Sequence, residues 1–114
     1  VLLAHLPTVE REAYLATGPF PALTSRTITD PERLREELAA VRQQGFARDN
    51  EEIAEGLICV AVPVHSPGGT VLAAISATRS IAEAARLPNE TMLAALRQAA
   101  GEAGARLAAP AAQH

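Results

Sequence analysis

Residues 56–78, GLICVAVPVHSPGGTVLAAISAT, contain the pattern that decides the fold of this chain. Two runs rich in apolar and β-branched residues, 57–64 and 70–78, flank the sequence HSPGG at positions 65–69. Branched aliphatic residues favour strands, and a cluster of Ser, Pro and Gly between two such runs is typical of a hairpin turn. The stretch therefore predicts an antiparallel β-hairpin.

The two faces of this hairpin follow from the position of its turn. We first assume that the turn is centred on Pro67 and Gly68. One face of the hairpin then pairs Ile58 with Ala77, Val60 with Ile75, Val62 with Ala73 and Val64 with Val71. The other face pairs Leu57 with Thr78, Cys59 with Ser76 and Ala61 with Ala74. The first face is branched and apolar, as a buried core requires. The second has small, weakly polar side chains, which suit either a small-molecule pocket or the close approach of a helix. A one-residue bulge would exchange the two faces.

Composition limits the kinds of protein that this chain can be. Its 114 residues correspond to one domain or part of one, with 48% hydrophobic and 20% charged residues. The net charge of −3 and the lack of a Lys/Arg stripe argue against a nucleic-acid surface on this chain. A single Cys excludes an internal disulfide and a cysteine-based metal cage, so we expect the reducing cytoplasm. No apolar run reaches transmembrane length, so we expect no membrane association.

Helical patterns flank the hairpin on both sides. The first 17 residues look helical around a break at Pro7, and a second helix begins at Asp30-Pro31 and ends at Gly45, capped either by Asp30 or by a Thr29–Glu32 capping box. The segment 24–29 is predicted to be extended, 46–49 is a short strand, and 79–87 is a polar connection. A last helix runs from residue 88 or 89 to about residue 107, with a predicted buried stripe of Met92, Leu96, Ala99, Ala103 and Leu107. The fold class is α/β (α+β): an antiparallel-containing sheet with flanking helices.

Four carboxylates precede the hairpin within a short acidic segment: Asp49, Glu51, Glu52 and Glu55. Such a cluster is compatible with a metal site or an acid/base pair, but no His lies close in sequence and the spacing matches no known metal loop. A solvated acidic loop is the favoured interpretation. No nucleotide fingerprint and no nucleophile motif is present. We therefore assign no catalytic residue, metal ligand or cofactor.

Five short motifs follow one another along the chain: VLLAHLP (1–7), LTSRTITDP (23–31), VRQQGFARDNEE (41–52), EGLICVAVPV (55–64) and AAIS (73–76). Their order and spacing resemble the effector-binding domain of the IclR family of bacterial transcription regulators. Together they cover about residues 1–107. The sequence departs from the family pattern at Ile58, at Val62 and at Thr78-Arg79-Ser80, which bears on the pocket rim and on the ligand rather than on the fold.

The resemblance implies a GAF-like sensor domain that binds a small-molecule effector, an organic acid or an aromatic catabolite, and that self-associates to a dimer or tetramer. Residues 1–107 would be the later part of this domain and 108–114 a C-terminal tail, with DNA bound only through an N-terminal winged helix-turn-helix missing from this chain. The ligand-binding positions that correspond to the family's are Asp49, Cys59, Ser76 and, less directly, Thr78. Arg79 is interpreted as a surface residue at a strand end rather than as a partner of an anionic effector.

Two alternatives are open. A carboxylate- or metal-dependent small-molecule enzyme would use residues of the acidic segment. A ligand-free dimerisation module would have its small-residue hairpin face filled.

Overall fold

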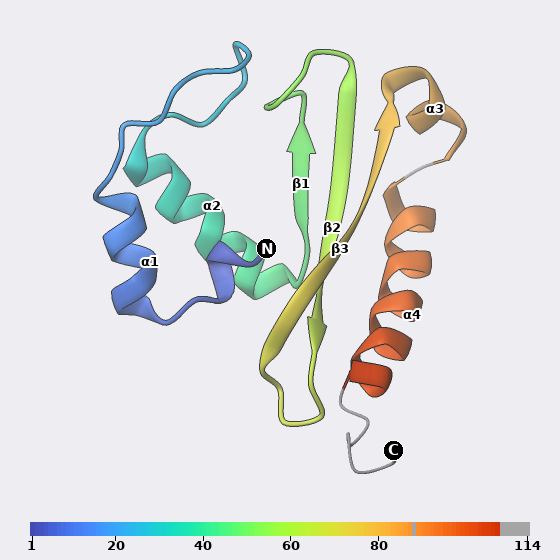
Figure 1. The fold of residues 1–114 in the computed structure, drawn as a ribbon. Coiled ribbons are helices and arrows are strands. Elements are labelled where there is room, and N and C mark those ends of the chain that lie inside the picture. Colours follow the sequence, from blue (N-terminus) through green and yellow to red (C-terminus); the bar gives the residue numbers. More distant parts are fainter. Residues whose placement is uncertain (88, 108–114) are drawn as a thin grey trace.

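The computed structural model describes residues 1–87 and 89–107 (Figure 1). Its elements are η1 (Leu3–His5), α1 (Thr8–Leu15), α2 (Pro31–Gln44), β1 (Ala47–Asn50), β2 (Leu57–His65), β3 (Val71–Ser80), α3 (Ile81–Arg86) and α4 (Asn89–Leu107). The tail predicted at 108–114 lies outside the described residues. No helix in the described part of the chain is both long and apolar enough to cross a membrane.

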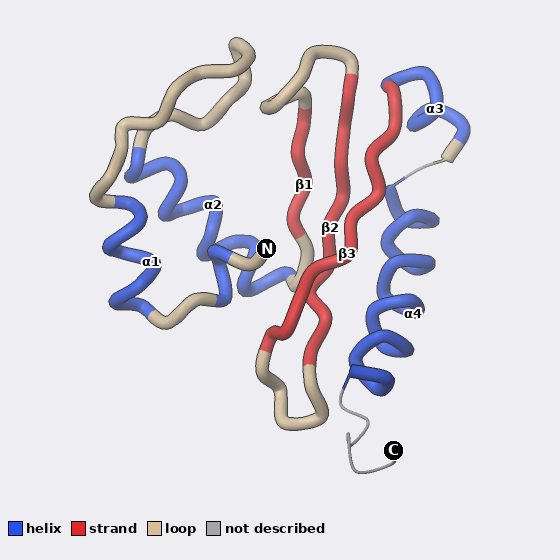
Figure 2. Tube along the Cα trace, viewed as in Figure 1, coloured by secondary structure: helices blue, strands red, loops and turns tan. Residues whose placement is uncertain are grey.

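The strands form one antiparallel sheet in the order β1-β2-β3, with helices on either side (Figure 2). Helix α4 lies along the β2–β3 hairpin, whereas η1, α1 and α2 lie beyond β1 (Figure 1). The predicted architecture of an antiparallel sheet with flanking helices is therefore confirmed.

The register of the hairpin differs from the predicted one by two residues, yet the two faces are as predicted. Val60 pairs with Ala77 and not with Ile75, and Cys59 pairs with Thr78 and not with Ser76. Two irregularities cause this difference. His65 pairs with Val71, which leaves residues 66–70 as the loop, and the register then shifts between Val64 and His65. Each irregularity offsets the pairing by one residue, so together they restore the alternation of side chains between the faces.

Helix α4 and the hairpin form the larger of two cores. Val60, Val62 and Val64 of β2 are almost fully buried against Leu96 and Ala100 of α4. Their apolar contact is possible because α4 approaches β2 very closely at Gly104. A Cβ atom added there would lie 2.3 Å from the carbonyl oxygen of His65.

The predicted buried stripe of α4 is partly wrong. The buried residues are Leu96, Ala100 and Gly104, while Ala99 is exposed and Leu107 is 60% exposed. Gly104 lies at the tightest contact between α4 and the sheet. In this orientation Ala99 and Leu107, two residues of the predicted stripe, point away from the sheet. Because α4 is rich in Ala on all sides, its sequence pattern defines no unique apolar face.

The smaller core joins η1, α1 and α2. Ala4, Leu15, Leu38 and Val41 are its buried members, and Ala47 of β1 packs against them. Asp30 is the N-cap of α2, with its side chain accepting the amide of Glu32 at 3.4 Å, which settles the choice between the two predicted caps.

The region after residue 78 differs from the predicted polar connection. Strand β3 continues to Ser80, and the short helix α3 begins with a capping box between Ser80 and Glu83. Arg79 is buried, with 5% of its surface exposed, so its interpretation as a surface residue is wrong. Its guanidinium donates to the carbonyl of Leu87 and to the side-chain oxygen of Asn89, which ties the end of α3 to the start of α4.

Candidate ligand-binding site

Three of the four predicted ligand-binding residues form a single row across the sheet. Asp49 of β1 is the direct partner of Cys59 in β2, and Cys59 is the direct partner of Thr78 in β3. Directly opposed residues of an antiparallel sheet project from the same face. Ser76, the fourth residue, lies two positions before Thr78 and therefore shares that face.

These four side chains line one cleft of about 370 Å³. The cleft lies in the size range of small-ligand sites, which is roughly 300–1,000 Å³. Its remaining lining residues are Ile53, Ala54, Leu57 and Ile58. The described part of the chain thus leaves the space beside Cys59 and Ser76 unfilled, whereas the interpretation as a ligand-free dimerisation module requires a filled face.

The two loop residues of this lining, Ile53 and Ala54, were missed by sequence reasoning. Ile53 and Ala54 lie in the β1–β2 loop, where a short segment among acidic residues has no periodicity that would assign its side chains to a face. Their position next to the predicted Asp49 was the one available signal. The cleft combines convergent polar groups with apolar walls, as small-molecule sites generally do.

The polar groups of the cleft differ in how firmly they are held. Asp49 is anchored, because its Oδ1 accepts the backbone amide of Glu52 at 2.8 Å. Cys59 is half-buried, and its Sγ lies 3.8 Å from the carbonyl oxygen of Val60. Ser76 and Thr78 are exposed, and their hydroxyls make no hydrogen bond to the described residues. The strand hydroxyls are therefore available to a ligand, and the carboxylate is preorganised beside them.

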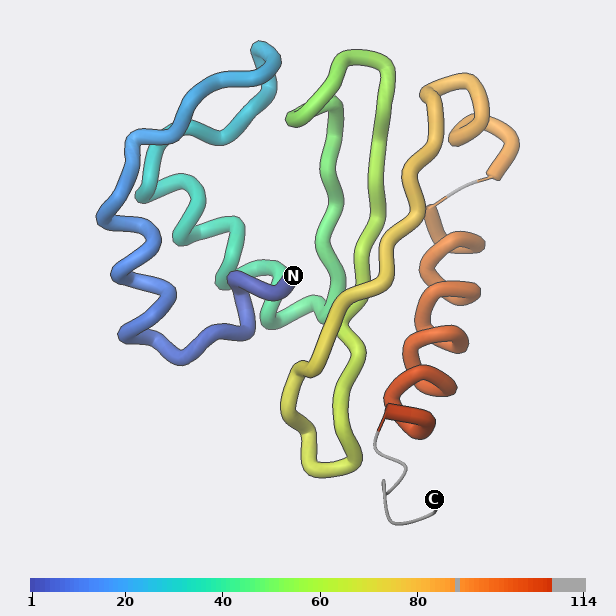
Figure 3. The backbone as a smooth tube through the Cα atoms, in the orientation of Figure 1, coloured from blue at the N-terminus to red at the C-terminus, as the bar shows by residue number. Residues whose placement is uncertain are grey.

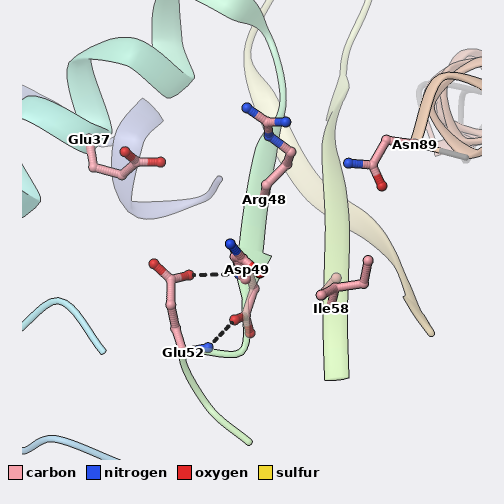
Figure 4. A pocket seen from close by; sticks show the side chains of 8 residues that line it. Glu37, Arg48, Asp49, Glu52, Ile58 and Asn89 are labelled. Carbon is pink, nitrogen blue, oxygen red and sulfur yellow. Dashed lines mark hydrogen bonds between the residues drawn. The ribbon is translucent and has the colours of Figure 1, made fainter. Parts of the chain in front are cut away.

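A second hollow of about 380 Å³ adjoins the cleft and shares Asp49, Ile58 and Cys59 with it. Its other lining residues are Glu37, Arg48, Asn50, Glu52 and Asn89. Figure 4 shows the side chains of Asp49 and Glu52 together at the end of β1, facing Glu37 from α2. Burial raises the pKa of the Glu52 carboxyl, and the negative charge of Asp49 raises it further. The two hollows thus meet at the Asp49 carboxylate, and the half-buried Glu52 lies beside it in the second hollow.

The carboxylates of the β1–β2 loop are tied into its structure. Glu51 accepts the amide of Gly56 at 3.0 Å through Oε1, and its Oε2 lies 3.5 Å from Nε of Arg26. Glu52 accepts the amide of Asn50 at 3.4 Å. Among the described residues, no three side chains of the metal-ligating types come together. Of these carboxylates, Asp49 lines the cleft, while Glu51 and Glu52 stabilise the loop that contributes Ile53 and Ala54 to it.

The chain is similar in sequence and in structure to known proteins. Residues 1–104 match the family described as "Bacterial transcriptional regulator IclR C-terminal". The transcriptional regulator KdgR of Dickeya chrysanthemi is 45% identical over 76 residues, which are 67% of this chain and 25% of that protein. The solved C-terminal domain of Escherichia coli KdgR is 37% identical, with a TM-score of 0.79 over 95% of this chain and 66% of that one.

A second similar structure contains a bound ligand. It is a double mutant of the PobR inducer-binding domain from Acinetobacter in complex with 3-hydroxybenzoic acid. This structure is 30% identical, with a TM-score of 0.78 over 90% of this chain and 59% of that one.

The fold and the matches define the class of this chain, which is similar to the C-terminal domains of bacterial transcription regulators. The chain belongs to the IclR family. The resemblance noted in the sequence and the predicted GAF-like fold class are thereby confirmed. The chain spans about a quarter to a third of the length of the curated relatives that it matches.

Proposed function

We propose that this chain binds a small-molecule effector in the cleft formed by Asp49, Cys59, Ser76 and Thr78. The observation that carries the proposal is the row from Asp49 through Cys59 to Thr78, which brings a carboxylate, a thiol and a hydroxyl to one open, partly apolar space. Residues 1–107 would form the later part of the effector-binding domain.

The effector that we propose is a small organic acid or an aromatic catabolite. Ile53 and Leu57 offer an apolar wall to a ring or a short carbon chain. The hydroxyls of Ser76 and Thr78 can donate to a ligand carboxylate, and Asp49 can accept from a ligand hydroxyl. The PobR complex supports this class, because 3-hydroxybenzoic acid carries both of these groups.

For the whole protein we propose a cytoplasmic, dimeric or tetrameric regulator that contacts DNA through a separate module. The known relatives of this chain are transcription regulators, which are not an enzyme class. Effector binding would favour one of two quaternary arrangements and so change the affinity for DNA. Such a shift requires different effector affinities in the two states.

The test is calorimetric titration of the chain with a panel of small acids that includes 3-hydroxybenzoate. Ser76→Leu places a branched side chain in the cleft and should abolish the heat of binding. Thr70→Leu is the matched control, since Thr70 is exposed in the hairpin loop away from the cleft. Equal binding isotherms for the wild type and Ser76→Leu would refute the assignment of the cleft.

A further inference from the structure

The loop between β1 and β2 is held from outside by a turn that precedes α2. Thr24 donates its hydroxyl to the carbonyl of Glu51 at 2.5 Å, and the hydroxyl of Thr27 donates to the carbonyl of Glu52. Arg26 adds the ion pair with Glu51. Figure 3 shows the two segments side by side, although they lie about 25 residues apart in sequence.

The turn is built to present these two hydroxyls. The oxygen of Thr27 accepts the backbone amides of Leu23 and Thr24 at 3.1 and 3.0 Å, and the oxygen of Thr24 accepts the amide of Arg26 at 3.0 Å. With their lone pairs engaged inside the turn, both hydroxyls have their protons available for the loop carbonyls. The extended segment predicted at 24–29 is therefore wrong at its start, where these side-chain bonds stabilise a turn instead.

The loop that the turn holds has little support of its own. Glu51 has φ of +59°, a left-handed conformation that a non-glycine residue keeps only when its surroundings enforce it. Ile53 is 67% exposed, and it borders both the cleft and a separate hollow beneath α2 that is also lined by Leu23 and Thr27. Apolar packing alone therefore does not fix the position of Ile53.

We infer that Thr24 and Thr27 are positioning residues that clamp the rim of the effector cleft. By holding the carbonyls of Glu51 and Glu52, they keep Ile53 and Ala54 against the space beside Cys59. This inference rests on the proposed function for its importance in effector binding, but the clamp itself is a property of the chain. Because the turn leads directly into Asp30, the cap of α2, the clamp also links the cleft to the helical unit.

Cys59 offers a test that needs no effector, because it is the only cysteine of the chain and it lines the cleft. The experiment measures the rate at which iodoacetamide alkylates Cys59 in the full chain, well below the melting temperature. The double variant Thr24→Val/Thr27→Val retains the side-chain shape and removes both hydroxyls. Its loop carbonyls would turn toward water, and alkylation should be at least about three-fold faster.

Two controls separate a clamp from a general loss of stability. Thr24→Ser/Thr27→Ser retains both hydroxyls and should restore the wild-type rate. Thr29→Val removes a hydroxyl of the same segment that makes no hydrogen bond to the described residues, and it should leave the rate unchanged. In low urea the faster rate of the double Val variant should be nearly independent of urea, as local opening exposes little surface.

A folded double Val variant that is alkylated at the wild-type rate would overturn the inference. So would a rate that rises steeply with urea, because it would report global unfolding. Titration of the wild type with 3-hydroxybenzoate and the other acids of the panel is scored separately. If no acid binds and the alkylation pattern holds, the proposed function fails and the clamp stands.

Discussion

Glu52 lies half-buried in the second hollow, next to the carboxylate of Asp49 that this hollow shares with the cleft. Burial and the neighbouring charge raise its pKa in the folded chain above the ordinary value of 4.5. At a pH below both values the carboxyl is protonated in the folded and unfolded chains alike. As the pH rises through the raised pKa, the folded chain must accept an unfavourable charge, so stability is lost.

We expect Glu52→Gln to be more stable than the wild type at pH 7 and to lose that advantage at pH 3.5. The gain should stay below about 1 kcal/mol, because solvent still screens a carboxyl that is only partly buried. Urea unfolding at the two pH values measures it. Glu36→Gln, which neutralises an exposed carboxylate of α2, is the control. A Glu52→Gln advantage that is the same at both pH values would contradict the raised pKa.

Arg79 is a second residue whose role depends on burial. Its guanidinium holds the carbonyl of Leu87 and the side chain of Asn89. Arg79→Ala removes both bonds and leaves a cavity, so we expect a loss of roughly 2–4 kcal/mol in the free energy of unfolding. Arg86→Ala, at an exposed site in α3, should cost far less. Comparable losses for the two variants in urea titrations would refute the proposed role of Arg79.

At the scale of elements, the two glycines of α4 have opposite roles. A Cβ added at Gly104 would collide with the carbonyl oxygen of His65, whereas nothing lies within 4 Å of one added at Gly101. Gly101→Ala should therefore stabilise the chain by about 0.5–1 kcal/mol through helix propensity. Gly104→Ala should destabilise it by about 1–3 kcal/mol, because α4 must move away from β2. Thermal melts of both variants provide the measurement, and shifts of the same sign would show that the close contact is absent.

Local patterns were sufficient to predict most elements, because each depends on nearby residues. The run before and after HSPGG predicts the hairpin, and Asp30-Pro31 with Gly45 predicts the ends of α2. The register was not predictable, since the bulge beside Val64 depends on how the loop at residues 66–70 closes. The face of α4 and the burial of Arg79 depend on contacts with distant elements. Sequence reasoning likewise found the strand residues of the cleft and missed its loop residues, Ile53 and Ala54.

At the scale of the whole molecule, the described residues form two cores that meet at β1. Val60, Val62 and Val64 with α4 make one, and the small helical unit of η1, α1 and α2 makes the other. Ala47 connects the helical core to the sheet, and the Thr24 and Thr27 clamp connects its adjoining turn to the cleft loop. A link of this kind would allow the helical unit to respond to the cleft while the hairpin and α4 stay fixed.

This arrangement predicts two levels of stability, which native-state hydrogen exchange can resolve. Leu15 and Val62 are both about 1% exposed, but they belong to different cores. Leu15→Ala should accelerate exchange of amides in α1 and α2 by local opening, while amides of β2 and α4 keep their protection. Val62→Ala should accelerate the slowest amides, those of β2 and α4, because their opening requires loss of the larger core. If Leu15→Ala accelerated exchange in all elements equally, the chain would open as one unit, and the helical unit could not move independently of the cleft.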